Sequence, residues 1–421
     1  MDKFVIEGGY QLSGRVKVSG AKNAALAIMP ATLLNNGMNV ITNVPEVNDI
    51  FTMIKLLRHI GVEAEYTEHF LKLDTSNITS QHAPYEHVKK MRASVYVLGP
   101  LLAKYGYAKV SMPGGCAWGP RPINLHLEAM KKLGAEIELE GGDIIAKASK
   151  LNGAHINFDV SSVGATGNAL MAAVLAKGTT LLQNAAKEPE ITNLCEYLVK
   201  MGAKINGIGT SQLEIEGVDE LSHADSEIIS DRIEAGTLLI AGAITKSDIE
   251  IEYKNSFHID SVLSKLQDSG AKVFVNNDII RIDSKDLEIE SVDVSTAVYP
   301  GFPTDMQAQW IAYMSLANGT STVTDTIYLD RFNHVPELNR LGASIELVNN
   351  SAIIQGVKKL KGAKVMSTDL RASASLVLAG LAAEGTTEVL RIYHLDRGYQ
   401  KIEEKLSSLG ANIKRVPTTE F

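Results

Sequence analysis

The chain has 421 residues, of which 45% are hydrophobic and 21% charged, a composition and length that suit roughly two or three globular domains. Its net charge of −8 argues against general binding to nucleic acid or acidic membranes, and two cysteines are too few for a disulfide framework. No apolar run approaches the about eighteen residues of a membrane helix, and the first residues lack the pattern of a signal peptide. We therefore expect a cytoplasmic protein.

One pattern recurs six times along the chain: an amphipathic helix, then a glycine, then an alternating strand. In the second copy, residues 125–133 have apolar side chains at helical spacing, and residues 135–140 alternate apolar and polar side chains. A glycine at this place can end the helix in the left-handed conformation. The glycines, separated by 73, 68, 68, 72 and 68 residues, are Gly61, Gly134, Gly202, Gly270, Gly342 and Gly410.

Each copy also contains a second helix that is apolar nearly all round, so we expect it to be fully buried. These helices are residues 24–34, 95–103, 169–176, 235–244, 307–317 and 375–383. One copy cannot hide such a helix alone, whereas three copies can pack their helices together with sheets outside. The sequence thus predicts an α/β protein with two similar domains of three units each, and a crossing between them near Asp231.

Basic residues recur at the junctions between units. Lys22, Arg92 and Arg371 each stand just before a buried helix, and Arg331 and Arg397 each follow an aspartate. Helix N-termini suit phosphate and carboxylate groups, and arginine adds paired hydrogen bonds to them. A single arginine is more often a surface charge, but the shared placement of these residues in the repeat predicts a site for a polyanion.

A loop over residues 111–122 separates a strand near residues 108–110 from the helix that starts near Asn124. It contains three prolines and three glycines, which exclude a helix or a central strand. Cys116 lies in this loop with Arg121 nearby, and a nearby positive charge lowers a thiol pKa and raises its reactivity. The alternative is an inert, buried cysteine.

Two further segments are candidates for chemistry. Thr304 or Asp305 can cap the helix that follows, or Asp305 can accept a proton from a substrate hydroxyl, and the residues leave both roles open. The polar, glycine-containing turn of residues 161–167 can hold a ligand by backbone contacts. Cys195 lies on the apolar face of the helix over residues 191–198, which indicates a core residue. The sequence contains no P-loop, dinucleotide fingerprint or zinc-ligand spacing.

Together these segments resemble the UDP-N-acetylglucosamine enolpyruvyl transferase family. The matching motifs run through essentially the whole chain in order: Gly20-Ala21-Lys22-Asn23, Met91-Arg92-Ala93-Ser94, Pro113-Gly114-Gly115-Cys116, Arg121-Pro122, Ser162-Val163-Gly164-Ala165-Thr166, Pro303-Thr304-Asp305-Met306-Gln307-Ala308-Gln309, Asp369-Leu370-Arg371-Ala372-Ser373 and Asp396-Arg397-Gly398. The resemblance implies an inside-out α/β barrel fold with two domains, residues 22–230 and residues 1–21 plus 231–421, and an active site in the cleft between them.

The resemblance also implies a reaction. The enolpyruvyl group of phosphoenolpyruvate passes to the 3-hydroxyl of UDP-N-acetylglucosamine by addition and elimination through a tetrahedral intermediate, with release of phosphate. This is the first committed step of bacterial peptidoglycan synthesis. The implied partners are these two small molecules, with no metal or organic cofactor, no nucleic acid, no membrane and no obligate protein partner.

Residue roles follow by match of motifs. Cys116 is the loop cysteine that can add to phosphoenolpyruvate and that fosfomycin alkylates, and Asp305 is the base for the sugar hydroxyl. The anion site is formed by Lys22, Arg121 and Arg397 at the phosphate, completed by Arg92, Arg331 and Arg371. The remaining substrate contacts are Asn23 at the amino sugar, Pro122, Ile123, Asn124, Leu125, Ser162, Val163 and Gly164 at the uridine diphosphate, and Ile327 and Asp369.

Some positions of the chain depart from the family pattern. Trp118 is unusually large, and Asn124 stands where an aspartate is common. Val160, Leu329 and Asp330 also differ from the family pattern. We therefore expect activity with altered affinity.

Two other functions are alternatives to this one. The nearest is that of the enolpyruvyl transferase acting on shikimate 3-phosphate, against which the cysteine loop and the uridine-side motifs argue. The other is a non-catalytic nucleotide-sugar-binding paralogue, against which the near-complete set of charged residues argues.

Overall fold

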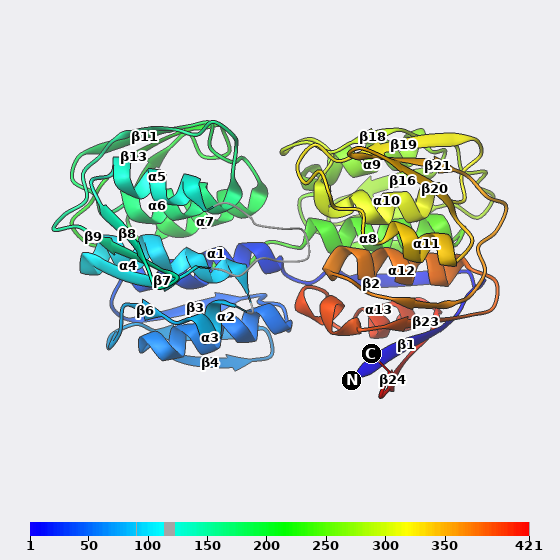
Figure 1. The fold of residues 1–421 in the computed structure, drawn as a ribbon, viewed down its shortest axis with the longest axis horizontal. Coiled ribbons are helices and arrows are strands. Elements are labelled where there is room, and N and C mark those ends of the chain that lie inside the picture. Colours follow the sequence, from blue (N-terminus) through cyan, green and yellow to red (C-terminus); the bar gives the residue numbers. More distant parts are fainter. Residues whose placement is uncertain (90, 113–122, 421) are drawn as a thin grey trace. The chain divides into compact units, whose positions relative to one another are not determined.

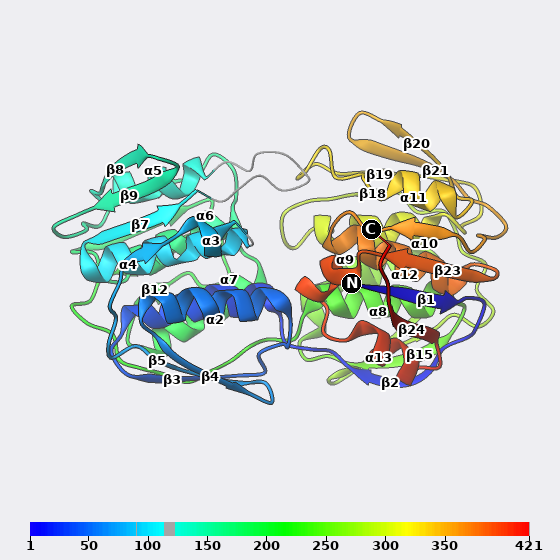
Figure 2. The ribbon, with the colours of Figure 1, turned by 60° about the horizontal axis from the view of Figure 1, so that its bottom comes forward.

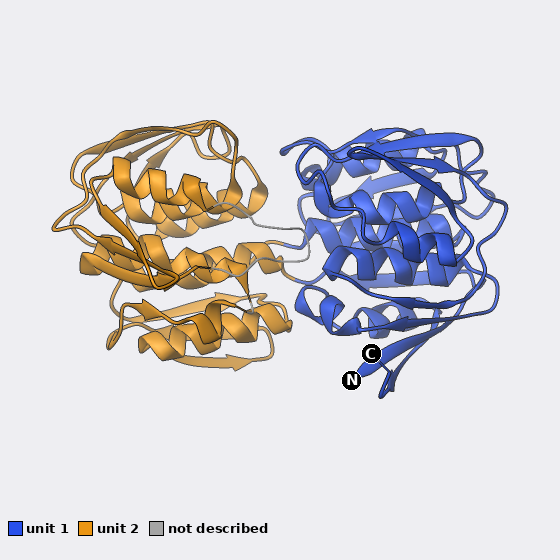
Figure 3. Cartoon of the chain, in the orientation of Figure 1, with its two compact units in different colours: residues 1–19, 230–421 blue, residues 20–229 orange. Residues whose placement is uncertain are grey.

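The computed structural model describes residues 1–89, 91–112 and 123–420. The chain divides into two compact units: unit 1 comprises Met1–Ser19 with Ser230–Phe421, and unit 2 comprises Gly20–Ile229 (Figure 3). Each unit has its own hydrophobic core. In the described part of the chain, no helix is both long and apolar enough to cross a membrane.

Over the described residues, unit 2 contains three four-stranded sheets of one topology. In each, a short edge strand pairs in parallel with its neighbour, and two antiparallel pairs follow. In sheet order, the strands are β14 (Ser226–Glu227), β3 (Met38–Thr42), β5 (Phe70–Asp74) and β4 (Glu63–Thr67); β6 (His82–Ala83), β7 (Tyr107–Ser111), β9 (Asp143–Lys147) and β8 (Glu136–Glu140); and β10 (His155–Asn157), β11 (Thr179–Gln183), β13 (Gln212–Glu216) and β12 (Lys204–Asn206).

Unit 1 repeats the same topology three times in its described residues. In sheet order, its strands are β2 (Ser13–Lys17), β15 (Asp248–Glu252), β17 (Ile279–Asp283) and β16 (Lys272–Asn276); β18 (Val294–Ser295), β19 (Thr320–Thr324), β21 (Ser351–Gln355) and β20 (Ser344–Val348); and β22 (Lys364–Met366), β23 (Thr386–Leu390), β1 (Asp2–Glu7) and β24 (Asn412–Pro417). The first residues belong to this unit because β1 pairs with β23 and β24, and β2 pairs with β15 (Figure 2).

The apolar helices lie inside each unit, with the sheets around them (Figure 1). In unit 2 they are α1 (Lys22–Ala31), α4 (Leu98–Tyr105), which continues the 3-10 helix η2 (Arg92–Val97), and α6 (Val163–Ala173). In unit 1 they are α8 (Arg232–Ile244), α10 (Gln307–Met314) and α12 (Leu370–Ala382). Small residues permit their close approach: a Cβ on Gly99 of α4 would lie 2.6 Å from the Asn168 carbonyl oxygen of α6. This arrangement confirms the inside-out barrel fold.

The amphipathic helix of each repeat ends as the sequence predicts. These helices are α2 (Asn48–Ile60), α5 (Asn124–Lys132), α7 (Pro189–Lys200), α9 (Asp260–Asp268), α11 (Val335–Arg340) and α13 (Ile402–Ser408). The six repeat glycines that follow them have φ values of 116°, 96°, 106°, 93°, 91° and 99°, all in the left-handed region. The remaining short elements are α3 (Tyr85–Val88), η1 (Thr32–Leu34), η3 (Ser256–Ile259), η4 (Thr304–Met306) and η5 (Ile392–Arg397).

Candidate active site

In unit 1, the structure brings three of the predicted site residues together. Asp305 lies in η4, directly before α10, and its carboxylate accepts from two arginines. Its Oδ1 is 2.8 Å from Nη1 of Arg331, and its Oδ2 is 2.9 Å from Nη2 of Arg371. The side chains of Arg331 and Arg371 are only 8% and 4% exposed, whereas that of Asp305 is 27% exposed. The carboxylate is therefore the most accessible part of a largely buried charge cluster.

The two arginines determine the charge of Asp305. Surrounding protein atoms act to raise the pKa of its carboxyl, but the guanidinium groups of Arg371 and Arg331 outweigh this effect and hold that pKa well below the usual range. The alternative role as a helix cap is not observed, because neither η4 nor α10 has a side-chain cap at its N-terminus. Asp305 is thus an ionised carboxylate bound by two cations, with a net positive charge on the group.

Arg371 is held from two further sides. Asp369 caps α12, accepting from the backbone N–H groups of Arg371 at 2.9 Å and Ala372 at 3.1 Å, and burial raises the pKa of its carboxyl. The guanidinium carbon of Arg371 lies 5.3 Å from the centre of the Tyr399 ring, within range of a cation–π interaction. Sequence reasoning missed Tyr399, although it stands two residues after the predicted Arg397.

Arg397 and Ile327 are the other two predicted residues of unit 1. Arg397 is the last residue of η5, which packs against α12, and it is partly buried. Ile327 follows β19 and is 37% exposed, and its backbone N–H donates to Asp325 at 2.9 Å. Asp325 was not among the predicted site residues.

In unit 2, Lys22 is the first residue of α1, and it is buried. Its Nζ lies 3.1 Å from Oδ2 of Asp49, a buried residue in the first turn of α2 that the sequence did not single out. Asn23 is the one exposed residue of α1. A buried lysine at a helix N-terminus can share its charge between Asp49 and an incoming anion.

A second group in unit 2 centres on His126, which sequence reasoning also missed. Its Nδ1 is 2.8 Å from Nδ2 of Asn168 in α6, and a Cβ on Gly164 would lie 3.0 Å from its Cε1 and Nε2 atoms. Burial and the charge of Arg92 lower the pKa of His126 to about 4, so the imidazole is neutral at pH 7. Through this ring, the start of α5 and the start of α6 lie against each other beside Arg92.

The predicted nucleotide contacts that are described lie at these same helix starts. Ile123 and Asn124 are the N-cap and first residue of α5, and Leu125 follows. Ser162 is the N-cap of α6, with Oγ accepting from the Ala165 N–H at 3.3 Å, and Val163 and Gly164 are the first residues of the helix. Exposed N–H groups at a helix start are suited to phosphate.

Three predicted residues, Cys116, Arg121 and Pro122, lie outside the described residues. The prediction for Cys195 is confirmed, because its side chain is buried in α7 and burial raises the pKa of its thiol to about 12. A thiol with that pKa is unreactive at neutral pH.

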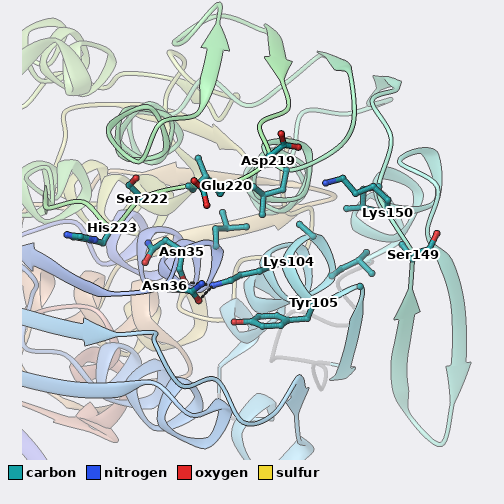
Figure 4. Close-up of a pocket in the computed structure, with 18 residues that line it drawn as sticks. Asn35, Asn36, Lys104, Tyr105, Ser149, Lys150, Asp219, Glu220, Ser222 and His223 are labelled. Carbon is teal, nitrogen blue, oxygen red and sulfur yellow. Dashed lines mark hydrogen bonds between the residues drawn. The ribbon is translucent and has the colours of Figure 1, made fainter.

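A cavity of about 760 Å³ in unit 2 lies at the opposite ends of the buried helices (Figure 4). It is lined where η1, α4 and α6 end, by Asn35, Lys104 and Leu175 among others. At its edge, Lys104 points toward Asn36 and donates to its Oδ1 at 2.7 Å. Of the predicted site residues that the structure describes, none lines this cavity, because they lie at the N-termini of the helices or in unit 1.

Comparison with known proteins identifies the family. Residues 6–406 match the family described as EPSP synthase (3-phosphoshikimate 1-carboxyvinyltransferase). Two proteins named UDP-N-acetylglucosamine 1-carboxyvinyltransferase are similar over the whole chain. That of Chloroherpeton thalassium is 59% identical over 100% of this chain and 99% of the relative, and that of Chlorobium chlorochromatii is 58% identical over 100% of both. The chain belongs to the UDP-N-acetylglucosamine 1-carboxyvinyltransferase family.

Solved structures show how this family relates to its neighbours in fold. The enolpyruvyl transferase NikO from Streptomyces tendae has a TM-score of 0.90 and 25% identity, covering 99% of each chain. The EPSP synthase from Acinetobacter baumannii has a TM-score of 0.77 and 18% identity, covering 99% of this chain and 100% of that one, and supports the fold alone. The six-unit fold is thus shared by enolpyruvyl transferases, and the whole-chain identity distinguishes the UDP-N-acetylglucosamine branch.

Proposed function

We propose that the chain transfers the enolpyruvyl group of phosphoenolpyruvate to the 3-hydroxyl of UDP-N-acetylglucosamine and releases phosphate, the first committed step of peptidoglycan synthesis. The observation that carries this proposal is whole-chain identity of 58–59% to proteins of that name, together with an accessible carboxylate between two buried arginines. The sugar hydroxyl needs a base, and phosphoenolpyruvate needs cations.

Unit 1 supplies the base and part of the anion site. Arg331 and Arg371 bind the carboxylate of phosphoenolpyruvate, with Arg397 at its phosphate, while Asp305 faces the sugar hydroxyl. In the free protein the two arginines keep the pKa of Asp305 low, which makes it a weak base. A substrate anion on the same arginines reduces their effect, so the carboxylate becomes a stronger base when phosphoenolpyruvate is bound.

Unit 2 supplies the nucleotide contacts and the other cations. Lys22 and Arg121 bind the phosphate, Arg92 completes the anion site, and Asn23 lies at the amino sugar. Residues 122–125 and 162–164 hold the uridine diphosphate, with phosphate at the helix N-termini. His126 is neutral at pH 7 and adds no positive charge near the start of α6, whereas Arg92 lies close enough to lower its pKa. Ile327 and Asp369 of unit 1 complete the substrate contacts.

The reaction then proceeds in two steps. A proton is added to the methylene carbon of phosphoenolpyruvate, Asp305 takes the proton of the 3-hydroxyl, and the sugar oxygen bonds to the adjacent carbon. In the second step the methyl group loses a proton, the carbon–oxygen bond to phosphate breaks, and phosphate leaves with its electron pair. Cys116 acts in proton transfer and can add to phosphoenolpyruvate. The reactants are cytoplasmic metabolites, so we propose a cytoplasmic location.

Phosphate release from phosphoenolpyruvate tests this function directly. We expect release with UDP-N-acetylglucosamine and none with shikimate 3-phosphate. Release with shikimate 3-phosphate alone would instead assign the chain to the other branch of the fold. Tight binding of the nucleotide sugar without any phosphate release would identify a binding protein without catalysis.

A further inference from the structure

Asp325, the residue directly after β19, is a buried carboxylate that reaches the proposed site only through its neighbours. Its side chain is 0% exposed, so it cannot touch a substrate. Its Oδ1 accepts from Oγ1 of Thr296 at 2.9 Å and from the backbone N–H groups of Ile327 and Tyr328, each at 2.9 Å. Its Oδ2 accepts from Oγ1 of Thr304 at 2.7 Å. Four donors therefore converge on one carboxylate.

The bond to Thr304 has a direction that affects Arg331. A hydroxyl has one proton to donate, and Thr304 donates it to Asp325, which leaves its oxygen lone pairs free. Nη1 of Arg331 donates to this oxygen at 3.0 Å and to Oδ1 of Asp305 at 2.8 Å. Asp325 thus determines that Thr304 presents an acceptor to Arg331.

Asp325 also holds the chain between β19 and Arg331. Its side chain accepts from the N–H groups of Ile327 and Tyr328, and its backbone carbonyl accepts from Nδ2 of Asn350 at 3.0 Å. The Tyr328 carbonyl accepts from the Arg331 N–H at 3.2 Å, and the Arg331 guanidinium carbon lies 5.6 Å from the Tyr328 ring centre. Both ends of Arg331 are therefore positioned through one buried side chain.

We propose that Asp325 is a positioning residue, which sets Arg331 for binding phosphoenolpyruvate and keeps Arg331 against Asp305. This inference rests on the proposed function and adds a residue to it. Asp325 acts only through Thr304 and the loop of residues 326–328.

The isosteric change Asp325→Asn reverses the donor and acceptor of the hydrogen bond between residue 325 and Thr304. The two backbone donors require an oxygen at the Oδ1 position, so the amide nitrogen faces Thr304 and donates to it. The Thr304 proton then turns toward Arg331, which is also a donor. We expect kcat/KM for phosphoenolpyruvate to fall roughly tenfold or more, the effect of losing one hydrogen bond to a charged group.

Two threonines provide a matched pair if Asp325→Asn fails to fold. Thr304→Val and Thr296→Val each remove one hydroxyl that donates to Asp325, but only Thr304 contacts Arg331. Thr304→Val should lower kcat/KM as Asp325→Asn does. Thr296→Val also removes the acceptor of the Thr326 N–H, at 3.0 Å, in the loop that leads to Arg331. It should therefore lower kcat/KM, but less than Thr304→Val, which removes the hydroxyl in contact with Arg331.

The pH profile separates positioning from a general loss of structure. The charged groups beside Asp305 are Arg331 and Arg371, and Asp369 and His334 lie near Arg331. With Arg331 displaced, its charge no longer lowers the pKa of Asp305, so the acid limb of kcat/KM should move to higher pH in Asp325→Asn and Thr304→Val. Thr296→Val should move the acid limb less, because Thr304 still contacts Arg331 in that variant.

The experiment measures kcat/KM for phosphoenolpyruvate against pH, and phosphoenolpyruvate affinity by calorimetry with the nucleotide sugar present, in the full chain and the three variants. Equal losses in all three variants, or an unmoved acid limb with weakened turnover, would overturn the role of Asp325. Phosphoenolpyruvate binding without turnover in the native chain would contradict the proposed function, while the affinities of the variants would still decide the role of Asp325.

Discussion

Asp305→Asn is the change that tests the charge cluster of unit 1 most fully. An amide keeps the shape and one acceptor oxygen but leaves two guanidinium groups, 8% and 4% exposed, without their anion. Removing one partner of a fully buried pair costs about 3–5 kcal/mol. Because Asp305 is 27% exposed and the amide still accepts one hydrogen bond, we expect a loss of about 2–3 kcal/mol in the free energy of unfolding.

The assay is denaturant unfolding at pH 7, followed by turnover under native conditions. Turnover should fall by roughly a hundredfold or more, because the base for the sugar hydroxyl is gone. Asp248→Asn is the matched control in the same unit: it breaks a bidentate pair with Arg281, whose side chain is 43% exposed, together with a contact to Lys285. The cations of this cluster are half exposed, so stability should fall by only about 1 kcal/mol, less than in Asp305→Asn, and turnover should not change.

The stability contributed by the Asp305 carboxylate should depend on pH in a defined direction. The folded pKa of Asp305 lies below its unfolded value, so its contribution is fully present above the unfolded pKa of about 3.9 and is lost as pH falls toward the folded pKa. The stability difference between the native chain and Asp305→Asn should therefore shrink below about pH 4. Native stability and native turnover in Asp305→Asn at pH 7 would refute both the buried-pair argument and the assignment of the base.

Three further changes test other assignments. Cys195→Ala should leave turnover nearly unchanged and reduce stability by roughly 1–2 kcal/mol, since a small core side chain is truncated; a large loss of turnover would show that the core assignment is wrong. Cys116→Asp should keep activity and resist fosfomycin, because a carboxyl can transfer the proton but is not alkylated; full sensitivity to the drug would contradict this. Gly164→Ala places a Cβ 3.0 Å from the His126 ring at the start of α6. The KM for the nucleotide sugar should therefore rise several-fold, while the KM for phosphoenolpyruvate should change little. Equal KM values for the nucleotide sugar in the native chain and the variant would argue against a nucleotide contact there.

The repeat was predictable because it depends on local chemistry. Each of the six glycines follows an amphipathic helix, and a left-handed residue is needed wherever such a helix must stop and a strand begin. The apolar helices were equally readable, since their composition alone requires burial. The ends of these helices were harder to predict. The helix expected over residues 307–317 ends at Met314, and Oγ of the next residue, Ser315, donates a hydrogen bond to the Ile311 carbonyl at 2.9 Å.

The candidate site was predictable in its residues but not in its pairing. Motif matching named Asp305, Arg331 and Arg371, but not their contacts. Asp305 and Arg371 meet through the packing of α10 and α12, and Arg331 reaches Asp305 from the segment between β19 and α11. The sequence therefore could not decide whether Asp305 is a helix cap or the base for the sugar hydroxyl. Tyr399 was missed because an aromatic residue beside a motif is most often part of the core.

The polar residues behind the site carried no sequence signal. Asp49 lies beside Lys22, His126 beside Asn168 and Asp325 beside Thr304, and all three positions depend on tertiary contacts. His126 illustrates the difficulty: it belongs to an amphipathic helix whose pattern treats it as an ordinary buried position. Such residues become visible only when the donors and acceptors around them are known.

The most direct test of the central claim is the chemical identity of the product. The native chain is incubated with phosphoenolpyruvate labelled with carbon-13 at the carbon that bears the phosphate, and with UDP-N-acetylglucosamine, and the nucleotide sugar is analysed by mass spectrometry and carbon-13 NMR. We predict a sugar that has gained an enolpyruvyl group, with the label in a vinyl ether carbon bonded to the 3-oxygen. Unmodified nucleotide sugar, with all the label still in phosphoenolpyruvate, would contradict the proposed reaction.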